Sequence, residues 1–127
     1  MKVLLKNLVF GLFLFVCSVV VIFAQNYPAP VPGDYVIKDF KFQSGETLPE
    51  LKLHYVTIGQ PIKNSSGIVT NAVIILHGTG GTNKQFLGRQ FADVLFKKGG
   101  LLDAEKYFII IPDNIGHGES SKPSDGL

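Results

Sequence analysis

Residues 72–82 are AVIILHGTGGT, and residues 108–120 are FIIIPDNIGHGES. Each stretch begins with a short apolar run without polar alternation and ends in a loop rich in glycine. Such runs are typical of strands in a parallel sheet that is covered on both faces. Because ligands bind outside the carboxyl ends of such strands, both loops are predicted to lie at one functional edge.

A helix is expected between the two apolar runs. Thr82 and Gln85 have the spacing of a capping box, and Gly99-Gly100 marks an end. Between these points, apolar side chains recur at helical intervals, at Leu87, Phe91, Val94 and Leu95. The order strand, helix, strand predicts a parallel pair of strands joined by a crossover.

An antiparallel hairpin is expected ahead of this unit. Apolar and polar residues alternate over residues 35–42 and again over 51–56, with the turn signal Ser44-Gly45-Glu46 between them. Residues 25–33 hold three alternating prolines, which favour an extended linker. His54 lies in the second alternating run, where a structural or solvent-facing role is expected.

The first 24 residues have the pattern of a cleaved secretory signal. Lys2 and Lys6 precede an apolar segment that ends at Ala24. The alternatives are an uncleaved membrane anchor and a lipoprotein signal acylated at Cys17. We expect cleavage after Ala24, a mature start at Gln25, and export to the periplasm or the medium. Contact with a membrane is then limited to the signal segment.

The other 103 residues carry 10 basic and 10 acidic side chains and are neutral. Because a basic face is needed to neutralise phosphates, no nucleic-acid partner is expected. Cys17 is the only cysteine, and the three histidines lack helical i, i+4 spacing, so no metal site is expected. Asn83 breaks both phosphate-binding glycine motifs, and no cofactor is expected.

The loop after the first apolar run suits an oxyanion hole. A strand that ends in His77-Gly78 and small residues can turn sharply and point backbone N–H groups outward. Such donors stabilise the negative charge of an acyl-transfer intermediate. The backbone N–H of Thr79 is the first candidate donor and that of Gly80 the second. Gly78 is expected to need the backbone freedom of glycine. The alternative is that the loop is only a tight turn.

The two loops together resemble the opening of α/β-hydrolase-fold enzymes, which have a His-Gly loop and then an Asp-x-x-Gly-x-Gly-x-Ser loop. Residues 44–55, SGETLPELKLHY, and Asn71-Ala72-Val73 are similar to the N-terminal part of homoserine O-acetyltransferase-like proteins. The resemblance covers residues 33–127. Loop-shaping roles are expected for His77, Gly78, Asp113, Gly116, Gly118 and Ser120.

The resemblance implies an α/β fold, namely the N-terminal portion of an α/β-hydrolase fold, incomplete at residue 127. It consists of an antiparallel hairpin, then strand, helix and strand of a mostly parallel sheet. The predicted organisation is a signal peptide at 1–24, a Pro-rich linker at 25–33 and this partial domain at 34–127. Because one helix cannot cover both faces of the sheet, residues 25–127 alone are expected to be unstable.

The implied function is hydrolysis or transfer of an acyl group from a small ester or acyl substrate. In the family, the nucleophilic Ser lies on a later Gly-x-Ser-x-Gly turn, which this chain does not contain. A Ser-His-Asp triad is therefore expected beyond residue 127, and the chain as given is expected to be inactive. Export favours hydrolysis, because acetyl-CoA is cytosolic. The alternative is a small exported ligand-binding module without catalysis, or the product of a degraded gene.

Overall fold

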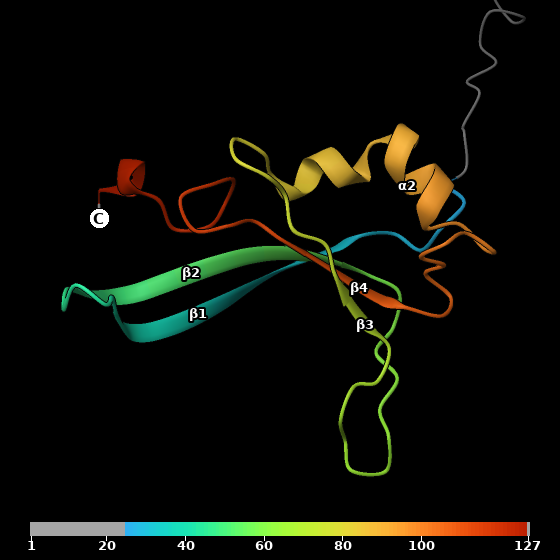
Figure 1. Ribbon diagram of the computed structural model, residues 1–127, viewed down its shortest axis with the longest axis horizontal. Coiled ribbons are helices and arrows are strands. Elements are labelled where there is room, and N and C mark those ends of the chain that lie inside the picture. Colours follow the sequence, from blue (N-terminus) through green and yellow to red (C-terminus); the bar gives the residue numbers. More distant parts are fainter. Residues whose placement is uncertain (1–24, 127) are drawn as a thin grey trace, which may run out of the picture.

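A computed structural model describes residues 25–126 of the 127-residue chain. Four strands form one mixed sheet in the order β1-β2-β4-β3 (Figure 1). The predicted signal segment at residues 1–24 lies outside the described residues. Among the described residues, no helix has the length and apolar character to cross a membrane.

The predicted hairpin is confirmed. Strand β1 (Val31–Lys41) pairs antiparallel with β2 (Thr47–Ile58), and Gly45 lies in the turn with φ +100°. The end of the hairpin that carries this turn projects beyond the rest of the sheet (Figure 1). Strand β1 begins inside the predicted linker 25–33, so that linker is shorter than the prolines suggest.

One face of β2 is buried in the sheet. His54, Val56 and Ile58 lie on alternate positions and are 8%, 6% and 1% exposed. Ile58 pairs with Ile109 of the neighbouring strand β4 (Phe108–Pro112), and both side chains belong to the main core. The solvent-facing alternative for His54 is therefore wrong, because the packing of β4 and its loop covers that face.

The predicted parallel pair is also confirmed. Strand β3 (Ala72–Ile74) pairs in parallel with β4, which in turn pairs antiparallel with β2. Strand β3 is shorter than the apolar run at 72–76, although the backbone N–H of Ile75 still donates to the carbonyl of Ile110 at 3.0 Å. Both strands therefore point their carboxyl ends to the same edge of the sheet.

The predicted single helix is two short ones. A 3₁₀ helix, η1 (Asn83–Leu87), is separated from α2 (Arg89–Leu95) by Gly88, whose backbone is extended. Thr82 makes no side-chain cap, so the capping-box prediction is wrong. The N–H of Asn83 instead donates to the carboxylate of Asp113 at 2.7 Å, and this distant group satisfies the helix end.

The core lies between these helices and the sheet. It contains Ile58, Ala92, Phe96, Ala104, Ile109 and Ile111, all almost fully buried. The ring of Tyr27 packs edge-on against Phe96 with centroids 5.8 Å apart, so the segment before β1 contributes to the core. Val94, one of the apolar residues that recur at helical intervals, is 55% exposed.

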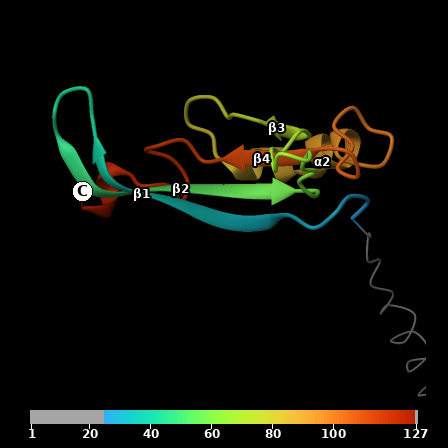
Figure 2. The ribbon, with the colours of Figure 1, turned by 90° about the horizontal axis from the view of Figure 1, so that it is seen from below.

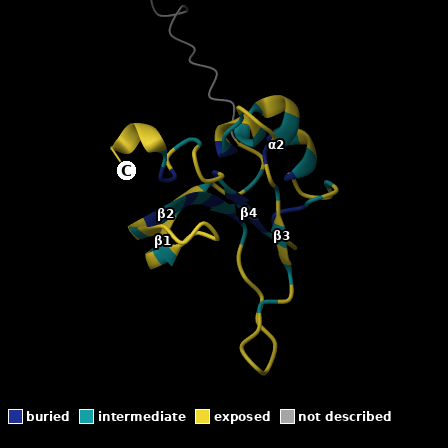
Figure 3. Cartoon of the chain, turned by 60° about the vertical axis from the view of Figure 1, so that its left-hand side comes forward, coloured by how far each residue is buried: buried dark blue, intermediate teal, exposed yellow. Residues whose placement is uncertain are grey.

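The helices η1 and α2 lie on one side of the sheet (Figures 1 and 2). On β3 and just after it, Ile74 and Leu76 are 61% and 65% exposed, whereas the strands β2 and β4 carry recurring buried positions (Figure 3). Within residues 25–126, the expected cover on both faces is therefore present on one face only.

Candidate active site

Two loops lie side by side at the carboxyl ends of β3 and β4. We define the first loop as residues 77–82 and the second loop as residues 113–121. The backbone N–H of Asn114 donates to Nε2 of His77 at 3.0 Å, and the Asn114 side chain reaches the His77 carbonyl at 3.4 Å. The sheet thus brings together the two sets of residues that the sequence singles out.

Asp113 is the centre of the second loop and is 1% exposed. Its Oδ1 accepts from the N–H of Asn83 at 2.7 Å, and its Oδ2 accepts from the N–H of Glu119 at 2.9 Å. Its own N–H donates to the carbonyl of His54 on β2 at 2.9 Å. Asp113 therefore fixes the start of η1 and the second loop through its carboxylate, and β2 through its backbone N–H.

The rest of the second loop closes around this carboxylate. Gly118 has φ +54°, and a Cβ there would collide with the Asp113 carboxylate, whereas Gly116, with φ +86°, faces open space. Ser120 is fully buried; its hydroxyl donates to the Asp113 carbonyl at 2.8 Å and accepts from the His54 N–H at 2.9 Å. Ser120 therefore has a structural position.

The first loop is a tight turn with open surroundings. The N–H of Gly81 donates to the Gly78 carbonyl at 3.0 Å, and Gly80 lies in the left-handed region with φ +77°. Gly78 has no left-handed φ, and nothing lies within 4 Å of an added Cβ. The expectation that Gly78 needs the freedom of glycine is wrong, because the turn places that requirement at Gly80.

The two candidate oxyanion donors differ in their partners. Thr79 is exposed, and among the described residues its backbone N–H has no hydrogen-bond partner. The N–H of Gly80 faces Nε2 of His117 at 3.4 Å. Of the two candidate donors, the Thr79 N–H is therefore without a partner among the described residues, whereas the Gly80 N–H faces an imidazole.

The buried side chain of His77 supports the first loop through hydrogen bonds to backbone groups. The side chain is buried, and because its Nε2 accepts from the Asn114 N–H, the neutral ring carries its proton on Nδ1. That Nδ1 lies 2.8 Å from the carbonyl of Gly78 and donates to it. Both ring nitrogens are engaged with backbone groups.

A chain of charged groups that sequence reasoning missed runs beside the loops. Nδ1 of His54 lies 2.7 Å from Asp34, and its Nε2 lies 3.7 Å from Glu119, which pairs with Lys84 of η1 at 3.1 Å. The hydrogen bond from Lys84, and then the charge of His54, lower the pKa of the Glu119 carboxyl. Asp34 and His54 are cross-strand partners, so only the strand register could have revealed this contact.

Another residue that the sequence did not flag as functional is Asn83, which is 1% exposed. Its side-chain amide has no hydrogen-bond partner among the described residues. Within the same part of the chain, no cluster of three His, Cys, Asp or Glu side chains is arranged to hold a metal ion.

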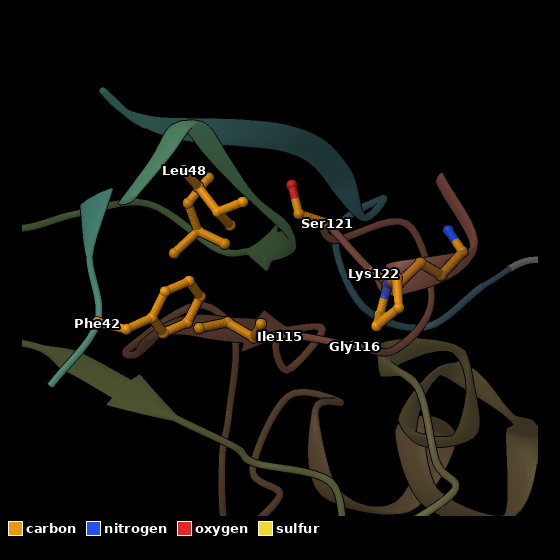
Figure 4. A pocket seen from close by; sticks show the side chains of 8 residues that line it. Phe42, Leu48, Ile115, Gly116, Ser121 and Lys122 are labelled. Carbon is orange, nitrogen blue, oxygen red and sulfur yellow. The ribbon is translucent and has the colours of Figure 1, made fainter. Parts of the chain in front are cut away.

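A pocket of about 390 Å³ opens beside the second loop (Figure 4). The turn end of the hairpin and the second loop supply most of its wall. Its apolar lining residues are Phe42, Leu48, Leu51, Ile115 and Pro123. A nonpolar group is therefore what this space accommodates best.

Comparison with known proteins gives one curated relative and several similar structures. No family model matches the sequence. A probable acyltransferase from Methanothermobacter thermautotrophicus is 36% identical over 95 residues, which cover 74% of this chain and 28% of the relative. The chain thus spans little more than a quarter of the length of the curated relative that it matches.

The structure is similar to parts of two larger enzymes. A homoserine O-acetyltransferase from Staphylococcus aureus matches with a TM-score of 0.59 at 20% identity, over 76% of this chain and 28% of that chain. The acetyl esterase MekB matches with a TM-score of 0.59 at 26% identity, over 75% of this chain and 25% of that chain. Both similarities establish a shared fold over about a quarter of each known chain.

Proposed function

We propose that this chain, whose described residues have the fold of part of an α/β-hydrolase, belongs to an exported enzyme that hydrolyses or transfers an acyl group. The proteins it resembles are a probable acyltransferase, a homoserine O-acetyltransferase and an acetyl esterase. All three names describe acyl chemistry, which supports a small ester or acyl compound as the substrate.

The observation that carries the proposal is the exposed N–H of Thr79, which has no hydrogen-bond partner within residues 25–126. The loop around it is fastened by His77 and, at its end, by Asp113. A backbone donor held in this way needs no reorganisation when negative charge develops on a carbonyl oxygen. Such a donor contributes about 3–4 kcal/mol to stabilising the transition state.

The nucleophile, acid and base are proposed to lie beyond residue 127, with the Ser on a Gly-x-Ser-x-Gly turn. The ring nitrogens of the three histidines contact side-chain or backbone groups among the described residues, and Ser120 is fully buried. These contacts support an assignment of the triad to other residues. The second oxyanion donor would be the N–H of the residue after the nucleophile.

The reaction follows from these roles. The Ser oxygen would attack the ester carbonyl while the His base takes its proton, and the carbonyl oxygen would become an oxyanion bound by the Thr79 N–H. Collapse of this intermediate breaks the ester C–O bond, and the His returns the proton to the leaving alcohol. Water or an acceptor alcohol would then release the acyl group from the Ser.

The decisive experiment uses the complete coding sequence that contains these residues. We expect a Gly-x-Ser-x-Gly motif after Leu127, turnover of p-nitrophenyl acetate by the full-length product, and loss of turnover when that Ser is replaced by Ala. The 127-residue chain is the matched inactive control. A stop codon directly after Leu127 would contradict the proposal and favour the non-catalytic module or a degraded gene.

The same assay distinguishes hydrolysis from transfer. With an added acceptor alcohol, a hydrolase continues to release free acetate, whereas a transferase forms the new ester instead. For export, the N-terminus of secreted material is expected at Gln25. Recovery of protein that retains Met1 in the membrane fraction would contradict cleavage and support the anchor.

A further inference from the structure

The two loops exchange hydrogen bonds through a pair of imidazoles. Nε2 of His77, in the first loop, accepts from the backbone N–H of Asn114 in the second at 3.0 Å. Nε2 of His117, in the second loop, accepts from the backbone N–H of Gly80 in the first at 3.4 Å. The two rings lie beside each other with centroids 5.3 Å apart. Each loop is therefore held by the histidine of the other.

The two histidines share one tautomer but differ in burial. Because each Nε2 accepts from an N–H, each neutral ring carries its proton on Nδ1. In His77 that Nδ1 donates to the Gly78 carbonyl at 2.8 Å, and in His117 it faces the Ile115 carbonyl at 3.3 Å. His77 is 5% exposed, whereas His117 is only partly buried and makes the longer bonds. The bond from Gly80 is thus the one that solvent and ligands can reach.

This contact adds to the bonds of His77 and Asp113 that fasten the first loop, because it engages the Gly80 N–H at the left-handed position of the turn. The central peptide of the turn joins Thr79 to Gly80, and the turn is closed by one bond from the Gly81 N–H to the Gly78 carbonyl. Glycine at the left-handed position allows the central peptide to rotate at low cost. No side chain crowds Gly78 or Gly80 within 4 Å of where a Cβ would lie. An outside acceptor at the Gly80 N–H therefore restricts the rotation of this peptide beyond what the contacts of His77 and Asp113 do.

We propose that His117 is a positioning residue for acyl transfer: its neutral imidazole binds the Gly80 N–H and so fixes the turn that presents the Thr79 N–H to the oxyanion. This inference rests on the function proposed above. It also explains why the loop uses one of its two candidate donors, because His117 occupies the other.

The contact depends on an imidazole nitrogen that carries no proton. A doubly protonated imidazole has no acceptor, so Nε2–H of the charged ring would face the Gly80 N–H and the hydrogen bond would be lost.

The test compares His117→Phe and His117→Gln with the wild-type full-length enzyme, using p-nitrophenyl acetate and a thermal melt. Phe keeps a flat ring but cannot accept a hydrogen bond, so kcat should fall by about 10- to 100-fold with little change in KM or Tm. Gln can accept through Oε1 and does not titrate. It should recover most of the lost turnover.

The matched control is His77→Gln, which replaces the buried partner and should lower Tm. If the His117→Phe variant does not fold, His117→Ala replaces it in the same comparison. An active wild-type enzyme in which His117→Phe turns over normally, or in which Phe and Gln lose turnover equally, would overturn the positioning role. A full-length wild-type protein without turnover would instead contradict the proposed function.

Discussion

The two loops at the same edge of the sheet differ in how their polar groups are bonded and how tightly they are packed. In the second loop, Asp113 and Ser120 are buried and bonded on every side, and Gly118 has no room for a side chain. In the first loop, Gly80 faces open space and the Thr79 N–H has no partner in the described residues. A rigid loop thus supports an open one.

The largest effect should come from filling the space beside Asp113. In Gly118→Ala, the new Cβ collides with a carboxylate that cannot move without losing its bonds to the backbone. Crowding and the left-handed φ together should destabilise the fold by roughly 3 kcal/mol or more. The measurement is urea unfolding of the full-length protein.

Gly116→Ala is the matched control in the same loop. It has φ +86° but open surroundings, so it should cost only about 1–2 kcal/mol, the penalty of a left-handed Cβ. Equal unfolding midpoints for the two variants would show that the second loop is not packed around Asp113 as tightly as the contacts indicate.

The next prediction compares the effects of alanine at Gly80 and at Gly78 of the first loop on the stability of the fold and on turnover. Gly80→Ala strains a left-handed residue in open space, so the fold should lose about 1–2 kcal/mol. Turnover should fall further, by up to about 100-fold, if the shifted turn no longer presents its donor. Gly78→Ala, without a left-handed φ or a nearby atom, should stay close to wild type in both assays. A larger loss of turnover at Gly78 than at Gly80 would contradict the geometry of the turn.

The elements that the sequence predicts correctly are those with local signals. Alternation over β1 and β2 and the unbroken apolar run of β4 depend only on neighbouring residues, and so does the turn around Gly45. The parallel pairing of β3 with β4 follows from the helix between them. Together these signals place both loops at one edge of the sheet.

The features that the sequence does not predict depend on contacts between residues far apart in the chain. The helix breaks at Gly88, and its N-terminal donor at Asn83 is satisfied by Asp113, which lies 30 residues along the chain. The glycine that needs a left-handed φ is Gly80 and not Gly78, and the sequence GTGG does not reveal the sign of φ at each position. Composition and spacing contain no information on either point.

The smallest effect concerns the exposed link between the loops. The hydrogen bond from Lys84, and then His54, lower the pKa of Glu119, so the ionised carboxyl stabilises the folded state. This contribution is complete above the unfolded pKa of about 4.3 and is lost as pH falls through the lower folded value. The stability difference between wild type and Glu119→Gln should therefore be constant near neutrality and shrink below roughly pH 4. Because both side chains are more than half exposed, the difference should be small and should fall further in high salt.

Lys84→Gln is the matched control and should remove most of the same pH dependence. A difference between wild type and Glu119→Gln that stays the same from neutral to acid pH would show that Glu119 acts through its shape, and the second loop would then be rigid without any charged link to η1.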